Sequence, residues 1–139
     1  MRFMIIVRAT AESETESAPA VDPGLLKEMV AYHQQLSEAG VLLDGAGLRP
    51  SSDGWRIRYS GGQRTITDGP FAEVKELIAG YTLIQVPSRE AATEWARRFP
   101  SPFGDTDCEI EVRQLWESED FRLGDTLNPL RMVAEGQLV

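Results

Sequence analysis

Cysteine and histidine are almost absent from this sequence. There is one cysteine, Cys108, so no disulfide can form within the chain, and a reducing, cytoplasmic setting is expected. One histidine and one cysteine cannot assemble a usual zinc site, and the acidic residues do not follow the spacing of a calcium-binding loop. We therefore expect no metal and no cofactor.

Long hydrophobic runs are missing as well. The apolar run at residues 3–7 is too short for the hydrophobic segment of a signal peptide and far too short to cross a bilayer. Positive charge is also scarce, because the formal net charge is -8 at pH 7. An acidic surface repels phosphate backbones. Neither a membrane nor a nucleic acid is an expected partner.

What the sequence does contain is enough apolar material for one folded domain. It has 139 residues, of which 42% are hydrophobic and 26% are charged. A domain of this length buries roughly two thirds of the surface of its unfolded chain. We predict the domain over residues 1–116. Residues 117–139 mix charged and apolar side chains without a clear period, and we expect them to form a C-terminal tail that covers a dimer partner.

The apolar periodicity predicts an alternation of strands and helices. Strands are expected over residues 2–8, 41–43, 55–59, 63–67 and 77–86, and a last strand from residue 108 to near Trp116. One helix should begin at Asp22-Pro23 and end at Gly40, and a second should begin at Ser88 and stop at Pro100. A polar loop is expected over 9–20 and turns at 44–47 and 61–62.

The first helix should bury one face, made of Leu25, Leu26, Met29, Val30, His33 and Leu36. Packing both predicted helices on one face of an antiparallel sheet would bury the apolar face of each helix. The predicted fold is therefore α+β and ferredoxin-like. The other sheet face, to which we assign Phe3, Ile5 and Trp55, is too apolar to stay in water. A symmetric homodimer of the dimeric α/β-barrel type would cover it.

The most specific motif lies between the fourth and fifth strands. It reads Asp68-Gly69-Pro70-Phe71-Ala72-Glu73-Val74-Lys75-Glu76-Leu77 and is followed by Gly80-Tyr81. With the surrounding pattern, it resembles the DGPF branch of the YCII-related superfamily over roughly residues 1–116. The resemblance implies a ferredoxin-like dimer. It also implies a small bacterial protein, and some relatives are associated with extracytoplasmic-function sigma factors.

His33 and two aspartates are the candidates for catalysis. An imidazole can act as a general acid or base near neutral pH, and Asp68 or Asp44 would orient it. The YciI-type branch of the superfamily implies a catalytic His–Asp pair, but its histidine position, counted back from Gly40, is closer here to Met29. Two other interpretations remain open: His33 is an inert, half-buried histidine, and Asp68 is a turn residue whose carboxylate binds backbone amides.

Three further residues are candidates for ligand binding. Lys75 could hold an anion, Glu76 could accept a proton, and Tyr81 could place its hydroxyl in the same cleft. The alternatives are that the first two are solvated or bridge to a dimer partner and that the tyrosine only packs. Three arginines of the hairpin could also meet an anion or merely protect a strand edge: Arg56, Arg58 and Arg64.

Two kinds of function therefore remain open. The first is a small dimeric enzyme that performs acid–base chemistry on a small carbonyl or phenolic molecule in a cleft beside the DGPF turn. The second is a non-catalytic ligand-binding or regulatory module, linked to extracytoplasmic-function sigma-factor signalling as the resemblance implies. The first needs a working site around His33; the second does not.

Overall fold

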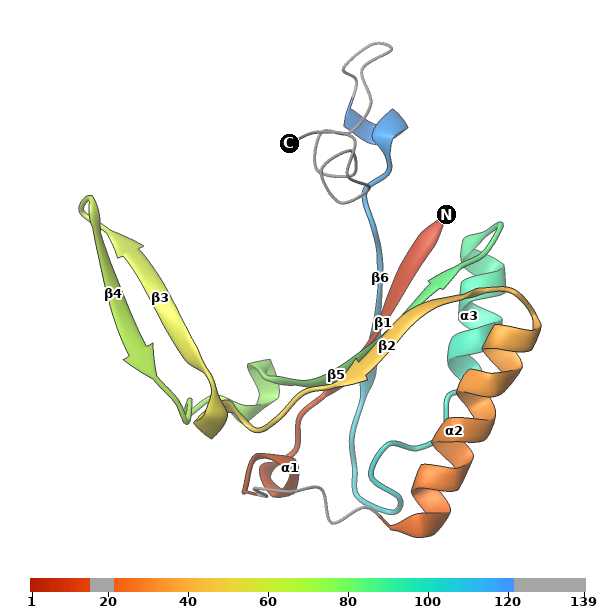
Figure 1. Cartoon of the computed structure of the whole chain (residues 1–139), viewed down its shortest axis with the longest axis horizontal. Coiled ribbons are helices and arrows are strands. Elements are labelled where there is room, and N and C mark those ends of the chain that lie inside the picture. The colour runs from red at the N-terminus through yellow and green to blue at the C-terminus, as the bar shows by residue number, and fades with distance from the viewer. Residues whose placement is uncertain (16–21, 122–139) are drawn as a thin grey trace.

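The computed structural model describes residues 1–15 and 22–121 (Figure 1). Its elements, in chain order, are β1 (Arg2–Arg8), α1 (Ala11–Thr15), α2 (Pro23–Glu38), β2 (Leu42–Gly47), η1 (Ser51–Asp53), β3 (Trp55–Ser60), β4 (Gln63–Asp68), η2 (Val74–Glu76), β5 (Ile78–Gln85), α3 (Arg89–Arg97), β6 (Ile110–Gln114) and η3 (Ser118–Phe121). The η elements are short 3₁₀ helices. No helix within the described ranges is both long and apolar enough to cross a membrane.

Four strands form an antiparallel sheet in the order β2-β5-β1-β6. Helix α2 connects β1 to β2, helix α3 connects β5 to β6, and both helices lie on the same face of the sheet (Figure 1). This order and these connections are those of the ferredoxin-like α+β fold. The predicted fold class is confirmed, and the hairpin β3–β4 is an insertion between β2 and β5 that forms its own two-stranded sheet.

The core lies between the helices and the sheet. Its buried members are Phe3, Ile5, Tyr32, Leu36, Ile84, Val86 and Ala92. Phe3 pairs with Ile84 across β1 and β5, and Ile5 lies two residues further along the same face. Because Phe3 and Ile5 pack under the helices, our assignment of them to the uncovered face is wrong. Alternation along β1 and β5 places a different set there: Met4, Ile6, Tyr81 and Leu83, here called the open face.

The buried stripe of α2 is rotated from the predicted one. Tyr32 is 3% exposed and belongs to the core, whereas Leu26 and Val30 are 51% and 57% exposed. The Tyr32 hydroxyl donates a hydrogen bond to the Trp95 carbonyl oxygen at 2.7 Å, and its ring meets Phe99 edge-on with 5.1 Å between the ring centroids. The rotation of α2 buries the aromatic ring of Tyr32 against α3 and leaves Leu26 and Val30 more than half exposed.

Tyr32 should make the domain sensitive to alkali. Burial raises the pKa of Tyr32 to about 12 from 10.0, although the nearby charge of Arg98 acts to lower it. Between these two values the unfolded chain has lost the phenol proton and the folded chain retains it, so stability falls as pH rises. Urea unfolding between about pH 9 and pH 11.5 should show this loss, and Tyr32→Phe should make the decline shallower.

The control for this titration is Tyr59→Phe, which removes a phenol that is exposed in the single chain and, at concentrations where the chain is monomeric, should leave the decline as steep as in the parent. If Tyr32→Phe declined as steeply as the parent, another group would be responsible for the alkaline loss.

Two local predictions differ from the structure. Helix α1 occupies part of the predicted polar loop, because Thr10 and Ser13 cap each other: each side-chain oxygen accepts a hydrogen bond from the other residue's amide, at 2.9 and 3.1 Å. The predicted turn at 44–47 continues strand β2 instead. A Cβ on Gly80 would lie 2.9 Å from the Ala46 carbonyl oxygen, so glycine lets β2 and β5 approach this closely.

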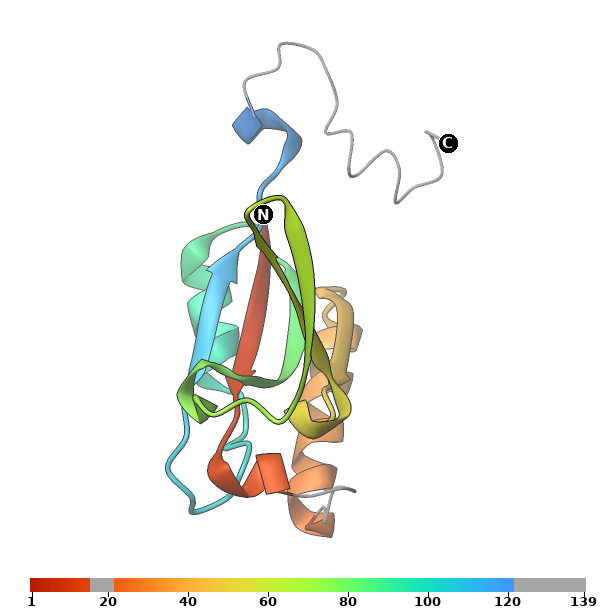
Figure 2. The same ribbon diagram turned by 90° about the vertical axis from the view of Figure 1, so that its left-hand side faces the viewer.

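The hairpin β3–β4 extends away from the body of the molecule, on the side of the sheet opposite the helices (Figures 1 and 2). We call residues 55–68 the arm. Gly61 and Gly62 have φ of 58° and 76°, which is the backbone of a tight hairpin turn, as predicted. We predicted that one side of β3 would be buried, but every residue of both arm strands is exposed in the single chain.

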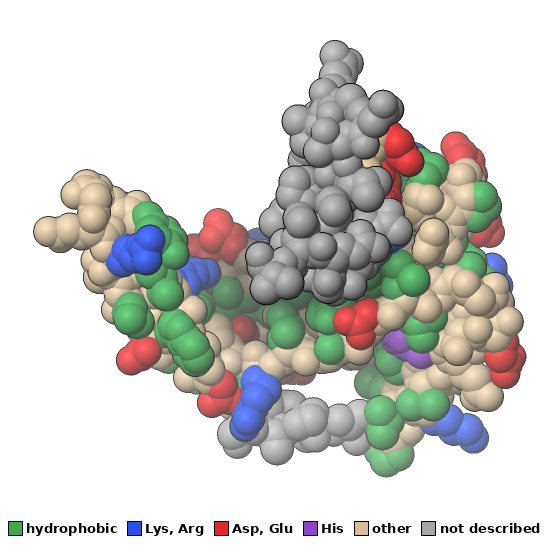
Figure 3. Space-filling model, turned by 45° about the horizontal axis from the view of Figure 1, so that its top comes forward, with side chains coloured by type: hydrophobic (Ala, Val, Ile, Leu, Met, Phe, Trp, Pro, Cys, Tyr) green, Lys and Arg blue, Asp and Glu red, His purple; other side chains and the backbone are tan. Residues whose placement is uncertain are grey.

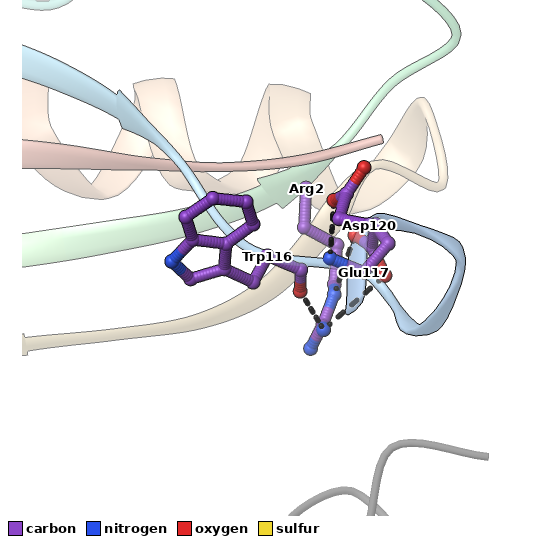
Figure 4. Close-up of polar contacts among 4 residues, drawn as sticks. All are labelled: Arg2, Trp116, Glu117 and Asp120. Atoms are coloured by element: carbon purple, nitrogen blue, oxygen red, sulfur yellow. Dashed lines mark hydrogen bonds and ion pairs between the residues drawn. The ribbon is translucent and has the colours of Figure 1, made fainter. Parts of the chain in front are cut away.

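The end of β6 is held against the start of β1 (Figure 4). Arg2 donates hydrogen bonds from Nε to Glu117 Oε1 at 3.0 Å and from Nη2 to the Trp116 carbonyl oxygen at 3.3 Å. The Glu117 amide in turn donates to Asp120 Oδ2 at 2.7 Å. These hydrogen bonds hold residues 116–120, which follow β6, beside the first residues of β1. Most of the predicted tail, residues 122–139, lies outside the described residues.

Candidate functional site

His33 lies between α2 and the sheet. Its Nδ1 is 2.8 Å from the Met29 carbonyl oxygen, and its Nε2 is 2.7 Å from Thr82 Oγ1. A carbonyl oxygen can only accept, so Nδ1 carries the proton, and in the neutral ring Nε2 accepts the Thr82 hydroxyl. Thr82 is 2% exposed. Both nitrogens are therefore engaged within the fold.

Neither candidate aspartate meets this histidine. The ring of His33 packs edge-on against Phe99 and Tyr32, and a Cβ on Gly45 would lie 3.4 Å from its Nε2. The histidine thus occupies the helix-covered side of the sheet, beneath strand β2. Gly45 lies directly beside the ring. These contacts give His33 the environment of a packed, hydrogen-bonded residue.

Asp44 and Tyr81 meet each other on the opposite side of the sheet. The Tyr81 hydroxyl donates a hydrogen bond to Asp44 Oδ2 at 2.9 Å, while Asp44 Oδ1 accepts from the Gly45 amide at 2.8 Å. The hydrogen bond to Asp44 raises the pKa of Tyr81, and the negative charge of the same carboxylate adds to the effect. The phenol therefore stays protonated at neutral pH, and the carboxylate keeps a lone pair for another donor.

The rest of the open face contains apolar side chains and paired charges. Tyr81 lies opposite Ile6 on β1 and opposite Ala46 on β2. Towards β6, Arg8 Nη2 contacts Glu111 Oε1 at 2.7 Å, and Arg113 contacts Oε2 of the same residue at 3.3 Å. The hydrogen bond from Arg8, followed by that from Arg113, lowers the pKa of the Glu111 carboxyl. The Asp44–Tyr81 pair thus lies beside an apolar centre, and beyond it two arginines share one glutamate.

The DGPF turn forms the base of the arm. The Gly69 amide donates to the Gly54 carbonyl oxygen at 2.9 Å, and the Phe71 amide donates to Ser51 Oγ at 3.1 Å. Ser51 in turn donates from its amide and its hydroxyl to Glu14 Oε2, at 2.7 and 2.8 Å. Sequence reasoning missed both Glu14 and Ser51. Ser51 belongs to the turn chemistry at 50–54 and could have been singled out from the sequence, but nothing in the polar stretch at 9–20 distinguishes one carboxylate from the others.

The remaining candidates lie around this base and away from His33. Asp68 is exposed, and its carboxylate makes no hydrogen bond or ion pair with any residue the structure describes. Lys75 and Glu76 are exposed in η2. The guanidinium of Arg56 lies 3.8 Å from the centre of the Phe71 ring. The structure therefore brings together Asp44 and Tyr81 and leaves the other candidates apart from them.

Two hollows on the described surface lie away from this pair. One, of about 230 Å³, lies along α3 between Arg89 and Arg97, and the other, of about 350 Å³, surrounds the arm tip from Tyr59 to Arg64. Both are open and shallow. Among the described residues there is no group of three or more histidine, cysteine or acidic side chains placed to hold a metal ion. The Asp44–Tyr81 pair lies on an uncovered surface of the single chain.

Three comparisons connect the chain to known proteins. It is 36% identical over 94 residues to an uncharacterized protein, R00369, of Rhizobium meliloti (strain 1021), which covers 68% of this chain and 75% of that protein. Among solved structures it is similar to 5-chloro-2-hydroxyhydroquinone dehydrochlorinase (TftG) from Burkholderia phenoliruptrix AC1100 in complex with 2,5-dihydroxybenzoquinone. The identity is 12% and the TM-score 0.46, over 86% of this chain and 98% of that one.

The family comparison covers most of the chain. A profile described as the YCII-related domain matches residues 1–117, a range that includes the sheet, both long helices, the arm and the Asp68–Phe71 turn. The chain belongs to the YCII-related family.

Proposed function

We propose that the protein is a homodimeric, cytoplasmic enzyme that performs acid–base chemistry on a small carbonyl or phenolic molecule at Asp44 and Tyr81. The observation that carries this proposal is the 2.9 Å hydrogen bond from the Tyr81 hydroxyl to Asp44 on the open face of the sheet. It joins a proton donor and a proton acceptor beside an apolar surface. Such a surface suits the ring of a small aromatic ligand.

The two side chains have complementary parts in this chemistry. Asp44 has the free lone pairs to accept a proton from a substrate hydroxyl or from a carbon beside a carbonyl group. When substrate binds, the phenol of Tyr81, whose pKa is raised, turns its single O–H from Asp44 to the substrate oxygen on which negative charge develops. The transferred proton returns from the Asp44 carboxyl to product or solvent, so the pair ends each cycle as it began.

The position of the pair supports a dimer. Asp44 is exposed and Tyr81 is half-buried in the single chain, and acid–base catalysis gains strength where water is excluded. A second copy against the open face would exclude that water and would bury the apolar side chains around it. His33 then acts through packing, because it supports strand β5 from the other side of the sheet.

A second candidate function is a non-catalytic binding module, as some relatives' association with sigma factors suggests. The observation in its favour is the arm, whose exposed aromatic and aliphatic side chains suit a protein partner. In that case the Asp44–Tyr81 hydrogen bond would only join strand β2 to β5. The two functions differ in one expected result. Removing this hydrogen bond should weaken the binding of a small phenol if the protein is the proposed enzyme, and should leave that binding unchanged if it is a binding module.

The test is binding of small phenols by NMR, with phenol itself as the first probe. We expect Asp44→Asn and Tyr81→Phe each to weaken phenol binding by about tenfold, the cost of one charge-assisted hydrogen bond. In the same variants, absorbance at alkaline pH should show Tyr81 ionising at lower pH after Asp44→Asn, because the acceptor charge is gone.

The matched control is Asp105→Asn, which neutralises an exposed carboxylate in the loop after α3 and should change neither result. Equal phenol binding by the parent, Asp44→Asn and Tyr81→Phe would reject the proposed site and favour the binding module.

A further inference from the structure

We propose that the arm of one protomer closes over the open face of a second copy and brings Arg64 to the Asp44–Tyr81 site, which thereby takes small aromatic anions. This inference rests on the proposed function and adds to it both the contact that builds the dimer and the charge of the ligand.

The arm has two unlike sides. Residues directly opposite each other in an antiparallel pair project to the same side, and the register pairs Ile57 with Ile66, Tyr59 with Arg64 and Trp55 with Asp68. One side of the arm therefore carries Trp55, Ile57, Tyr59 and Ile66, with Arg64 and Asp68 beside them. The other side carries arginine, threonine and other polar residues: Arg56, Arg58, Ser60, Gln63, Thr65 and Thr67.

The apolar side is uncovered in the single chain. Trp55 is 64% exposed and Ile66 is 67% exposed. An isolated two-stranded hairpin is marginally stable in water unless its apolar side packs on something. Within the described residues, β3 and β4 have extensive contacts only with each other. The arm therefore presents an apolar strip that its own sheet does not cover.

The occupant that fits this strip is a second copy of the chain. The arm and the open face lie on the same side of the molecule, away from the helices (Figures 1 and 2). Hydrophobic side chains lie along the arm and on the surface between the arm and the helices (Figure 3). A two-fold axis between two copies places each arm on the other copy's sheet. The same contact then occurs twice, and it buries both arms and both open faces.

The dimensions and charges agree with this arrangement. A six-residue strand is about 20 Å long, whereas the outer strands of a four-stranded sheet are about 14 Å apart. The arm is thus long enough to cross a partner's sheet. It contains three arginines and one aspartate in a chain of net charge -8, so the arm is the basic part of an acidic protein and is attracted to the rest of a second copy.

Arg64 brings a further cation from the partner to the Asp44–Tyr81 site. The arginines on the open side of the sheet are engaged with glutamates of their own chain, Arg2 with Glu117 and both Arg8 and Arg113 with Glu111. The guanidinium of Arg64 lies 5.1 Å from the centre of the Tyr59 ring, on the apolar side of the arm. A planar guanidinium held on an aromatic ring binds a carboxylate through two parallel hydrogen bonds. The closed site therefore favours an aromatic ring that carries a negative group.

The dimer contact is tested with charges placed on either side of the arm. Ile57→Asp/Ile66→Asp places two carboxylates on the apolar side, and Thr65→Asp/Thr67→Asp places two on the opposite side of the same hairpin. By light scattering after size exclusion, we expect dimers for the parent and for the threonine variant and monomers for the isoleucine variant. A monomeric parent, or a dimeric isoleucine variant, would overturn the arm contact.

A second measurement guards against simple unfolding of the arm. In a background with Trp95 and Trp116 replaced by phenylalanine, Trp55 is the only indole. Its emission should lie at shorter wavelength in the dimeric parent and move to longer wavelength on dilution, while the far-ultraviolet circular dichroism stays constant. Emission of a solvent-exposed indole at every concentration would contradict the proposal even if the chain were dimeric.

The role of Arg64 is tested with two probes, salicylate and phenol, which differ by a carboxylate. Arg64→Gln should weaken salicylate binding by about tenfold and leave phenol binding unchanged. Arg58→Gln, on the opposite side of the arm, should change neither. If Asp44→Asn weakened phenol binding while Arg64→Gln left salicylate binding intact, the proposed function would stand and this inference would fail. If Asp44→Asn changed neither probe, the proposed function itself would fail.

Discussion

Replacing Gly69 with alanine should destabilise the domain by about 3 kcal/mol or more, near the upper end of overpacking effects. A Cβ at this position would collide with the carbonyl oxygen of Ser51 and lie 2.6 Å from its carbonyl carbon. Both atoms belong to the backbone, so no side-chain rotation relieves the contact. Either the turn at 50–54 or the DGPF turn has to move.

The movement would break the contacts that hold the arm. Gly69 donates its amide to Gly54, and the next residues are held by Ser51, whose other bonds go to Glu14. These contacts join three segments that are distant in sequence. Gly69→Ala should therefore lower the midpoint of urea unfolding and also weaken the dimer, because the arm would leave its base at a different angle.

The matched control is Gly54→Ala, in the same turn. A Cβ there would lie 3.6 Å from the Ser51 carbonyl oxygen, an ordinary contact, and the residue's φ of -119° suits alanine. We expect little change in the unfolding midpoint. If the two alanine variants were equally stable, the two turns would have to adjust freely, and the rigid base inferred for the arm would be wrong.

The fold was predictable because most of its determinants are local. Strand β1 and the start of α2 at Asp22-Pro23 follow from an apolar run and from capping chemistry, and both were placed correctly. Gly61-Gly62 marked the hairpin turn for the same reason. Strand order follows from two long helical connections, which leave few ways to bury two apolar stripes on one sheet.

The details that failed depend on contacts distant in sequence. Periodicity could not choose between Leu26 and Tyr32 for the core, because the choice depends on the position of α3. Asp44-Gly45 has the composition of a turn and is a strand because β5 lies beside it. The structure does not bring His33 to either aspartate for a similar reason: Asp44 lies on the opposite face of the sheet and Asp68 at the end of the arm, and these positions depend on helix rotation and strand register together.

Replacing His33 with leucine should cost about 2–3 kcal/mol, because it leaves a buried hydroxyl without its partner. Thr82 is 2% exposed, and its Oγ1 lies 2.7 Å from His33 Nε2. Leucine fills similar space but offers no acceptor. Gln35→Leu, an exposed change on the same helix, should be nearly neutral by comparison. Urea unfolding monitored by circular dichroism measures both.

A double-mutant cycle separates packing from catalysis at this position. Thr82→Val removes the hydroxyl, so His33→Leu should cost less in that background, with a coupling of about 1–2 kcal/mol between the two sites. Phenol binding by folded His33→Leu should equal that of the parent, since the open face lies on the other side of the sheet. Full stability combined with lost binding would return His33 to the site. The expected result, lost stability with binding retained, would mean that the single histidine stabilises the helix-covered side of the sheet through Thr82 and takes no part in the Asp44–Tyr81 site.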